Sequence, residues 1–374
     1  MESGLRVAVV GLGFGAEFVP IYLAHPQVQE VAICDPDPEV LATIDERFGI
    51  VQRFADLDAV LNAEFDAVHL ITPIPLHADQ AVAVLDAGRH CACTVPMALS
   101  IADLQRVVAA QRRSGKQYMM METAVYTREF LFVKGLAETG ALGRIQFLRG
   151  AHYQDMEGWP AYWAGLPPMY YATHAIAPLL ALAGARATTV HCFGSGEMRQ
   201  ELRQQYGNPY PVETAIFQLE GVSVAAEVTR SLFHTAHAYT ESFCVYGERK
   251  SFEWQQLEEE QPVLFTMEPL QSGRGRPVGV TRVSAPDRQD LLPPAIAQFT
   301  QRGVYDAANA HLSFLQGGGH SGSHPHLVHE FVRSIIEERA SDVDAVTAAN
   351  WTAAGICAHQ SAMASGAAMT IPRF

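Results

Sequence analysis

The chain has 374 residues, 48% hydrophobic and 18% charged, which is enough for two globular domains with full cores. Its formal net charge of −14 argues against nucleic acid or an anionic membrane as a partner, because both would repel it. No apolar stretch is long enough to cross a bilayer. The six scattered cysteines and the absence of a leader pattern in "MESGLR" predict a reduced, cytoplasmic protein.

The first 120 residues alternate short apolar runs with helical patterns. Strands are predicted at 6–12, 30–35, 67–72, 90–95 and 117–122, with helices between them. This order predicts a parallel sheet with right-handed crossovers, and the continuous apolar runs indicate that both of its faces are covered. We therefore expect an α/β domain with a doubly wound parallel sheet, a Rossmann domain, over residues 1–123.

A different pattern begins near residue 124. A helix at 126–140 is followed by longer strand patterns at 144–154, 187–195, 214–220, 223–231 and 242–247, with hairpin turns at Glu220-Gly221 and Gly247-Glu248. Residues 271–323 have weak patterns and are interpreted as long loops, with a lid as one option. Helices at 326–338 and 343–364 close the chain. Residues 124–374 are thus predicted to be an α+β domain with a large open, mostly antiparallel sheet.

The segment "GLGFGA" (11–16) follows the first strand directly. Gly11 permits a tight turn, Gly13 lets the backbone approach a pyrophosphate, and Ala16 lets helix and strand pack closely. Asp35 ends the second strand, where it can accept hydrogen bonds from an adenosine ribose. No Arg or Lys follows in "DPDPEV", so a 2′-phosphate would be repelled and NAD is favoured over NADP. The alternative is a flavodoxin-like or ligand-free domain with a glycine turn.

Several motifs together resemble the Gfo/Idh/MocA oxidoreductases, named for glucose–fructose oxidoreductase and inositol dehydrogenase. They are the glycine turn, "ITPIPLHADQAVAVLDAGRH" (71–90), "GALGRIQF" (140–147), a histidine in "HAIAPLLALAG", and "FVRSI". The resemblance implies a Rossmann domain followed by an open-sheet domain, and NAD(P)-linked hydride transfer on sugars, cyclitols or polyols. Some members cleave glycosides through transient oxidation, and at least one is a non-catalytic regulator. The family is usually dimeric or tetrameric, so we expect a homo-oligomer.

The glycine turn and the resemblance together predict a cofactor site. His77 resembles a family position near the cofactor, although it could instead only cap the next helix. The predicted cofactor-binding residues are Gly11, Gly13, Phe14, Gly15, Ala16, Asp35, Thr72, Pro73, His77 and Pro96.

The chain departs from the family pattern at two catalytic positions. Members usually carry Glu-Lys-Pro where this chain has Thr94, Val95 and Pro96, and the lysine is catalytic. They also commonly place an aspartate where this chain has Tyr170. Val95 cannot move a proton, while the retained proline predicts a preserved strand end, with a cis Val95–Pro96 bond as one option.

His174 is therefore the first candidate for the base that removes a hydroxyl proton, because imidazole titrates near neutrality. Tyr170 and Tyr171 are predicted to assist it. The alternative for all three is packing: a lone histidine on an apolar helix is usually structural, and the tyrosines could pack against the sheet.

The segment "WPAYWAGLPPMYY" (159–171) is rich in aromatic residues, whose faces suit the C–H faces of a sugar ring. Trp159, Tyr162 and Trp163 are predicted to line a substrate wall, and an aromatic mini-core that anchors a loop or subunit interface is the alternative. Further along, "GGGHSGSHPHLVHEF" (317–331) is predicted to bring His320 or His324 to the sugar, with Pro325 in the first turn of a helix. The histidine spacing matches no common zinc signature, and no metal site is predicted.

Three functions follow. The first is an NAD-dependent oxidoreductase that transfers a hydride between nicotinamide and a sugar or polyol hydroxyl, with His174 as base. The second is an NAD-assisted glycoside hydrolase or lyase that oxidises a ring carbon transiently. The third is a non-catalytic sensor that binds NAD or a sugar, motivated by the two substituted catalytic positions. Fold alone does not decide among them.

Overall fold

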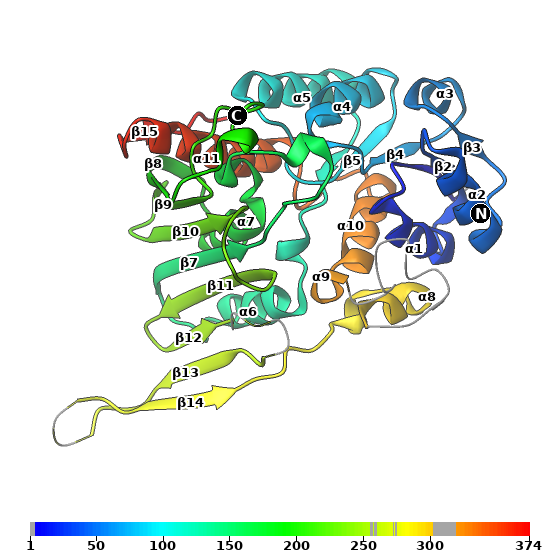
Figure 1. Cartoon of the computed structure of the whole chain (residues 1–374). Helices are drawn as coiled ribbons and strands as arrows, with labels where there is room; N and C mark the ends of the chain where they lie inside the picture. The colour runs from blue at the N-terminus through cyan, green and yellow to red at the C-terminus, as the bar shows by residue number, and fades with distance from the viewer. Residues whose placement is uncertain (1–3, 255–256, 258–259, 272, 274, 302–318) are drawn as a thin grey trace. The chain divides into compact units, whose positions relative to one another are not determined.

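The computed structural model describes residues 4–254, 257, 260–271, 273, 275–301 and 319–374 (Figure 1). Within these ranges the chain forms two compact units. Unit 1 contains the residues up to Thr127 and those from Asp287 to Ala349, and unit 2 contains Arg128–Pro286 and Asn350–Arg373. Over the same ranges, none of the helices has the combination of length and apolar character that crossing a bilayer requires. The separate NAD-binding and substrate-binding roles expected for 1–123 and 124–374 remain predictions.

Unit 1 is built on a parallel sheet in the order β3-β2-β1-β4-β5-β6. Strand β1 lies between β2 and β4, so the strand order reverses there, and its carboxyl end is the point at which such sheets bind ligands. The predicted parallel α/β fold is confirmed, strand by strand, at the five expected positions. The strands are β1 (Leu5–Val10), β2 (Val28–Cys34), β3 (Arg53–Phe54), β4 (Ala67–Leu70), β5 (His90–Cys93) and β6 (Tyr118–Met120).

Helices cover this sheet, and their ends follow local sequence signals. Asp37 caps the first helix after β2, accepting a hydrogen bond of 2.9 Å from the Glu39 amide, and Ser100 caps α5 in the same way. Gly49 and Gly115 end α2 and α5 in the left-handed conformation. The helices are α1 (Val19–Ala24), α2 (Pro38–Phe48), α3 (Leu57–Asn62), α4 (His77–Asp86) and α5 (Ile101–Ser114), with short 3₁₀ turns at Gly15–Glu17, Ile74–Leu76 and Thr123–Val125.

Unit 2 contains a large mixed sheet in the order β14-β13-β12-β11-β7-β10-β9-β8-β15. Most neighbours are antiparallel, as expected, and both predicted hairpin turns are present. The meander is interrupted where β7 lies between β11 and β10, and β7 pairs with β10 in parallel. The strands are β7 (Ile145–Tyr153), β8 (Ala187–Ser195), β9 (Val212–Leu219), β10 (Ala225–Ser231), β11 (Thr240–Gly247), β12 (Lys250–Glu253), β13 (Val263–Met267), β14 (Val278–Arg282) and β15 (Met369–Thr370).

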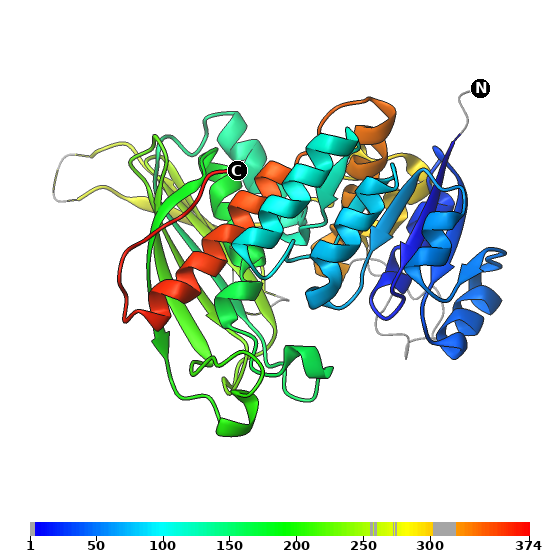
Figure 2. The ribbon, with the colours of Figure 1, turned by 90° about the horizontal axis from the view of Figure 1, so that it is seen from above.

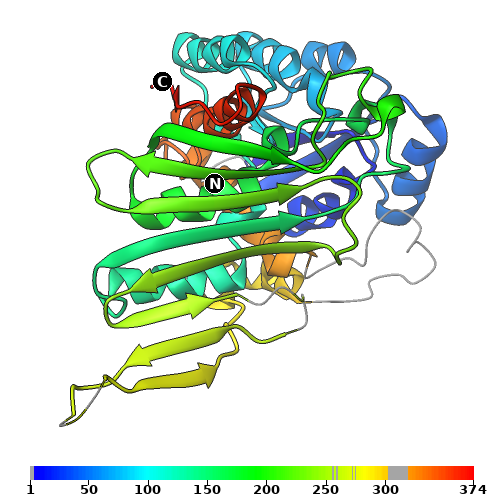
Figure 3. The same cartoon turned by 60° about the vertical axis from the view of Figure 1, so that its left-hand side comes forward.

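Helix α7 (Thr173–Ala183) packs on the centre of this sheet, against β7, β10 and β11. The close approach needs a glycine in the strand, because a Cβ at Gly150 would lie 2.2 Å from the carbonyl oxygen of Ala175. Figure 2 shows the sheet nearly edge-on, with α6 (Arg128–Glu138) and α7 on one side. Figure 3 shows the opposite face, which is open among the described residues and exposes Phe193, Ile216 and Val280.

The remaining elements correct one prediction. Residues 271–323 were expected to be long loops, but they contain β14 and short helices, α8 (Pro294–Ala297) among them. Apolar and polar residues alternate only weakly in the exposed edge strand β14, so its sequence gave little indication of a strand. Most of the predicted lid, 302–318, lies outside the described residues. The closing helices are confirmed as α10 (His324–Ile336) and α11 (Ala345–Met363), and all six cysteines are free.

Candidate functional site

The glycine turn sits at the carboxyl end of β1 in unit 1. Gly11 has φ of +90°, and a Cβ there would lie only 2.3 Å from the carbonyl oxygen of Ile71, so no other residue fits without displacing β4. Gly13 is exposed, and a Cβ placed on it would meet nothing within 4 Å among the described residues. Gly13 is therefore not required for packing, and a side chain added there would point into open space.

Asp35 follows β2 and stabilises the glycine turn through hydrogen bonds. Its carboxylate accepts the Leu12 amide at 2.8 Å and the Asp37 amide at 3.0 Å. A carboxylate has about four lone-pair sites, so two backbone bonds leave capacity for ribose hydroxyls. Phe14, Gly15 and Ala16 continue the turn into the first 3₁₀ helix, where Gly15 and Ala16 are buried.

The loops after β4 and β5 are joined by His77. Its Nδ1 lies 2.8 Å from the carbonyl oxygen of Pro96 and its Nε2 lies 2.8 Å from that of Thr72. The imidazole is fully buried, and burial lowers its pKa although the two carbonyls oppose this. His77 therefore holds the two loops together and does not use its side chain to cap α4. Direct contact of His77, Thr72 or Pro73 with a cofactor remains a prediction.

The strand end after β5 keeps the expected geometry, because the Val95–Pro96 bond is cis. The side chain of Val95 is buried, with 7% of its surface exposed. This position therefore offers an apolar surface and no proton acceptor.

The two histidines assigned to substrate binding, His320 and His324, lie beside the glycine turn within unit 1. Their rings are 5.9 and 5.5 Å from the ring of Phe14. The Nδ1 of His324 also lies 2.8 Å from Oε2 of Glu17, and both of these side chains are buried. The sequence analysis missed Glu17, although a carboxylate in the first buried turn after a glycine turn is an informative signal. A sugar contact for either histidine stays a prediction.

The next two histidines of α10 bind separate partners. His329 Nδ1 lies 3.0 Å from His25 Nε2, and His326 Nε2 lies 3.2 Å from the carbonyl oxygen of Asp287. In the part of the chain that the structure describes, no group of three or more His, Cys, Asp or Glu side chains is placed to hold a metal ion.

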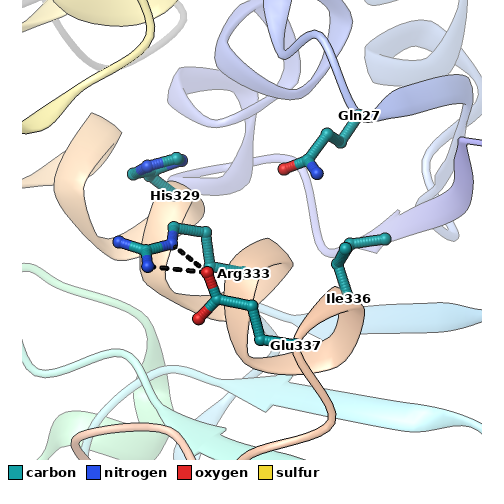
Figure 4. Close-up of a pocket in the computed structure, with 5 residues that line it drawn as sticks. All are labelled: Gln27, His329, Arg333, Ile336 and Glu337. Carbon is teal, nitrogen blue, oxygen red and sulfur yellow. Dashed lines mark hydrogen bonds and ion pairs between the residues drawn. The ribbon is translucent and has the colours of Figure 1, made fainter.

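A shallow hollow of about 240 Å³ lies beside His329 on unit 1 (Figure 4). It is lined by Gln27, His329, Arg333, Ile336 and Glu337. The guanidinium of Arg333 donates two hydrogen bonds, of 2.6 and 2.8 Å, to Glu337, so the charges in the hollow compensate each other. This balance gives the hollow no evident preference for an ionic ligand.

In unit 2, the helix-facing side of the sheet carries a row of titratable side chains. The strand register places His152 of β7 opposite Arg230 of β10 on one side and Glu241 of β11 on the other. His174, in the first turn of α7, joins this row. Its Nε2 lies 3.8 Å from Oε1 of Glu241, and its ring centroid lies 5.3 Å from that of His152. We call His152, His174, Arg230, Glu241 and the adjoining Tyr239 the polar row.

Arg230 is the fully buried cation of the polar row. It donates to the carbonyl oxygens of Tyr171 (2.8 Å), His152 (3.2 Å) and Ser231. Burial lowers its pKa to about 10, so the guanidinium remains charged at neutral pH. Its bonds to backbone oxygens fix the ends of β7 and of the 3₁₀ turn at Pro168–Tyr171, which leads directly to His174.

The aromatic segment before α7 divides into two parts. Trp163 is buried and packs edge-on against Tyr171, whose ring in turn lies edge-on to that of His174 at 5.5 Å. Tyr162 stacks beside Trp163, whereas Trp159 is half exposed. A buried aromatic mini-core is thus present at Trp163, and the predicted substrate wall remains a prediction.

Tyr170, by contrast, belongs to a different cluster. Its ring packs at 5.1 Å against His359, whose Nδ1 lies 2.6 Å from Glu213, and the other oxygen of Glu213 accepts the Met169 amide at 2.8 Å. These buried hydrogen bonds anchor the turn. These contacts support packing for Tyr170, and its catalytic role is left as an untested prediction.

Comparisons with known proteins agree with this geometry. Residues 5–122 match the family model described as an oxidoreductase family with an NAD-binding Rossmann fold. Over this range the chain is similar to the Gfo/Idh/MocA oxidoreductases. The match lies within the first part of unit 1 and ends before unit 2 begins.

Curated relatives match part of the chain. A 1-carboxy-3-chloro-3,4-dihydroxycyclohexa-1,5-diene dehydrogenase of Comamonas testosteroni is 30% identical over 153 residues, 40% of this chain and 38% of that protein. A glycosyl hydrolase family 109 protein of Porphyromonas gingivalis is 28% identical over 194 residues, 46% of this chain and 42% of that protein. The chain thus spans less than half the length of these relatives.

Solved structures extend the similarity of fold over the whole chain. Levoglucosan dehydrogenase, solved with NADH and levoglucosan, superposes with a TM-score of 0.78 and 19% identity over 99% of this chain and 100% of that one. The scyllo-inositol dehydrogenase of Lactobacillus casei gives 0.73 and 17% over 99% of both. At this identity the likeness establishes the fold alone, a Rossmann unit plus an open-sheet unit, as the sequence predicted.

Proposed function

We propose that the protein is an NAD-dependent oxidoreductase that transfers a hydride between nicotinamide and a sugar or polyol hydroxyl, with His174 as the base. The observation that carries the proposal is that one chain holds both a glycine turn at the switch point of the Rossmann sheet, in unit 1, and a buried histidine beside a buried glutamate, in unit 2.

The residues at the glycine turn fit a dinucleotide. The space around Gly13 admits a diphosphate to the backbone, and Asp35 has acceptor capacity for ribose. Asp35 also opposes a 2′-phosphate, which favours NAD over NADP. When bound there, the nicotinamide would supply the hydride acceptor or donor. Phe14, Gly15, Ala16, Thr72, Pro73 and Pro96 complete the proposed cofactor site.

The chain itself must then handle the hydroxyl proton. Val95 contributes only apolar surface, so the acceptor must come from another position. His174 suits this task because an imidazole can take a proton near neutral pH. A neighbouring carboxylate favours the imidazolium that forms. Tyr171 lies edge-on to His174 and is proposed to shape the site, together with Trp159, Tyr162 and Trp163 as the wall toward the sugar.

A second function is favoured by the family 109 glycosyl hydrolases among the relatives. In this alternative the ring carbon is oxidised transiently, the aglycone is eliminated, and the hydride returns. The absence of a lysine at residue 95 fits an altered reaction. The two functions differ in their products: the first accumulates NADH with an oxidised sugar, and the second releases a glycoside's leaving group with no net NADH.

The open face of the large sheet supports the expected homo-oligomer. Phe193, Ile216 and Val280 on this face are 62%, 54% and 66% exposed, and an exposed apolar face is a candidate interface. We propose a homodimer or homotetramer built on it.

The deciding experiment incubates the protein with NAD and a panel of sugars, polyols and nitrophenyl glycosides, following NADH and nitrophenol in parallel. NADH from a free sugar or polyol would support the first function, and nitrophenol without net NADH the second. His174→Ala should reduce either turnover at least 100-fold while leaving NAD affinity nearly unchanged. An active variant would remove His174 as the base. NAD binding with no turnover across the panel would favour the regulator.

A further inference from the structure

His174 has a buried carboxylate neighbour that sequence reasoning did not identify. Glu241 is the second residue of β11, and its side chain is 5% exposed, against 4% for His174. The distance from His174 Nε2 to Glu241 Oε1 is 3.8 Å. Two such groups placed together out of water interact strongly, because the surrounding protein screens charge far less than water does.

Tyr239 supplies a hydrogen-bond donor to Glu241. The hydroxyl of Tyr239 donates to Oε1 of Glu241. Although Tyr239 is 39% exposed as a whole, desolvation of its hydroxyl, and then the nearby carboxylate, raise its pKa well above the usual value. The phenol therefore stays protonated at neutral pH and remains a hydrogen-bond donor.

Other groups near His174 come from the strands packed on α7 and from the turn before it. Helix α6 also packs on α7, and its buried titratable side chain is Glu129. His152 of β7 lies 5.3 Å away between ring centroids, and Tyr171 lies edge-on at 5.5 Å. Arg230 of β10 is the nearby cation, but its guanidinium is bound to carbonyl oxygens of the backbone and to Gln154 Oε1 at 3.0 Å. Glu241 is thus the carboxylate of the polar row, and its Oε1 lies 3.8 Å from Nε2 of His174.

We propose that Glu241 is the positioning residue for His174. Resting on the proposed function, this assigns the counter-charge of the same site. The Glu241 carboxylate lies 3.8 Å from Nε2 of His174 and acts on the imidazole through its charge. As the hydroxyl O–H bond breaks and an N–H bond forms on the imidazole, the ring becomes an imidazolium that the Glu241 carboxylate compensates. The carboxylate itself is not protonated in this step.

Glu241→Gln tests the assignment because it keeps the shape and removes the charge. Without the anion, His174 should release its proton at lower pH. The acidic limb of kcat/KM should therefore move down by about one pH unit. At pH 8, kcat/KM should fall about 10- to 100-fold. The matched control is Glu227→Gln, on the same sheet, which removes a carboxylate paired with Arg149 at 3.2 Å and should change neither quantity.

A second readout needs no substrate. In protein labelled with ¹³C-histidine, the NMR titration midpoint of His174, assigned from the His174→Gln variant, should fall by about one unit in Glu241→Gln. It should remain unchanged in Glu227→Gln. If no sugar is turned over but this midpoint moves, the proposed reaction fails and the Glu241–His174 coupling stands. An unmoved midpoint in a folded Glu241→Gln variant overturns the coupling whatever the activity.

If the Glu241→Gln variant does not fold, the Tyr239→Phe variant tests the same coupling through the NMR midpoint of His174. It leaves the carboxylate in place and removes the hydroxyl that donates to it, so Glu241 should act more strongly on His174 and raise the NMR midpoint by a few tenths of a unit. An unchanged midpoint would overturn the assignment. So would a Tyr239→Phe loss of kcat/KM as large as that of His174→Ala, because the phenol would then be the proton carrier.

Discussion

Gly11 and Gly13 stand two residues apart in the same turn, but the structure gives them opposite reasons for being glycine. At Gly11 an added methyl group collides with the residue that follows β4, with Ile71 oxygen at 2.3 Å and Ile71 carbon at 2.7 Å. At Gly13 an added methyl meets nothing within 4 Å among the described residues. Alanine at each position therefore separates the stability of the turn from its ligand binding.

The magnitudes follow from these surroundings. Gly11→Ala forces a side chain into the left-handed region, which costs roughly 1–2 kcal/mol, and displaces β4, which costs about 1–3 kcal/mol. The free energy of unfolding should thus fall by about 2–5 kcal/mol. Gly13→Ala should change stability by less than about 0.5 kcal/mol. It should weaken NAD binding roughly 10- to 150-fold, the equivalent of one lost charge-assisted hydrogen bond of about 1.5–3 kcal/mol.

The assay combines urea unfolding with calorimetric titration of NAD on both variants and the wild type. A destabilised Gly11→Ala variant alongside a stable Gly13→Ala variant that binds NAD weakly would support the cofactor site. Wild-type NAD affinity in Gly13→Ala would refute the approach of a diphosphate to this backbone. Full stability in Gly11→Ala would show that β4 yields more easily than the contact with Ile71 implies.

Two further predictions concern charge. Asp35→Arg should weaken NAD relative to NADP at least tenfold in the same titration, and an unchanged ratio would show that Asp35 does not face the ribose. Burial lowers the pKa of both His25 and His329 from 6.5 to about 4, so the folded state disfavours their protonation. Stability should be complete above about pH 6.5 and decline by roughly 2–3 kcal/mol as pH falls to 4, after allowance for solvent screening. Urea unfolding measured between about pH 6.5 and about pH 4 checks this prediction. If the stability of a His329→Gln variant declined as steeply with falling pH as that of the wild type, the prediction would be wrong.

The Rossmann unit could be predicted almost strand by strand because its signals are local. Strands buried on both faces appear as continuous apolar runs, and the glycine turn and Asp35 occur at fixed places relative to β1 and β2. The elements missed were those with weak local signals. Strand β3 has two residues, and β14 is an exposed edge strand between Gly- and Pro-rich segments.

The polar row could not be predicted in the same way, because its members come together only through strand register. Arg230 lies 78 residues after His152 and 11 residues before Glu241 along the chain. The register nevertheless places His152 of β7 between Arg230 of β10 and Glu241 of β11. The local signal was a titratable residue at a buried position of an alternating strand, repeated on three strands. Without the parallel pairing of β7 with β10, this signal cannot be assembled into a site.

The polar row also bears on the type of substrate. Arg230 and Glu241 have opposite charges, and the guanidinium of Arg230 is committed to backbone oxygens, so it is not presented to an anionic ligand. Displacing it would leave buried carbonyls unsatisfied at about 1–3 kcal/mol each. If the proposed function holds, a polar row built this way should favour a neutral hydroxyl-bearing substrate over a sugar acid. A panel of neutral sugars and the matching sugar acids tests this, and equal turnover of both would contradict it.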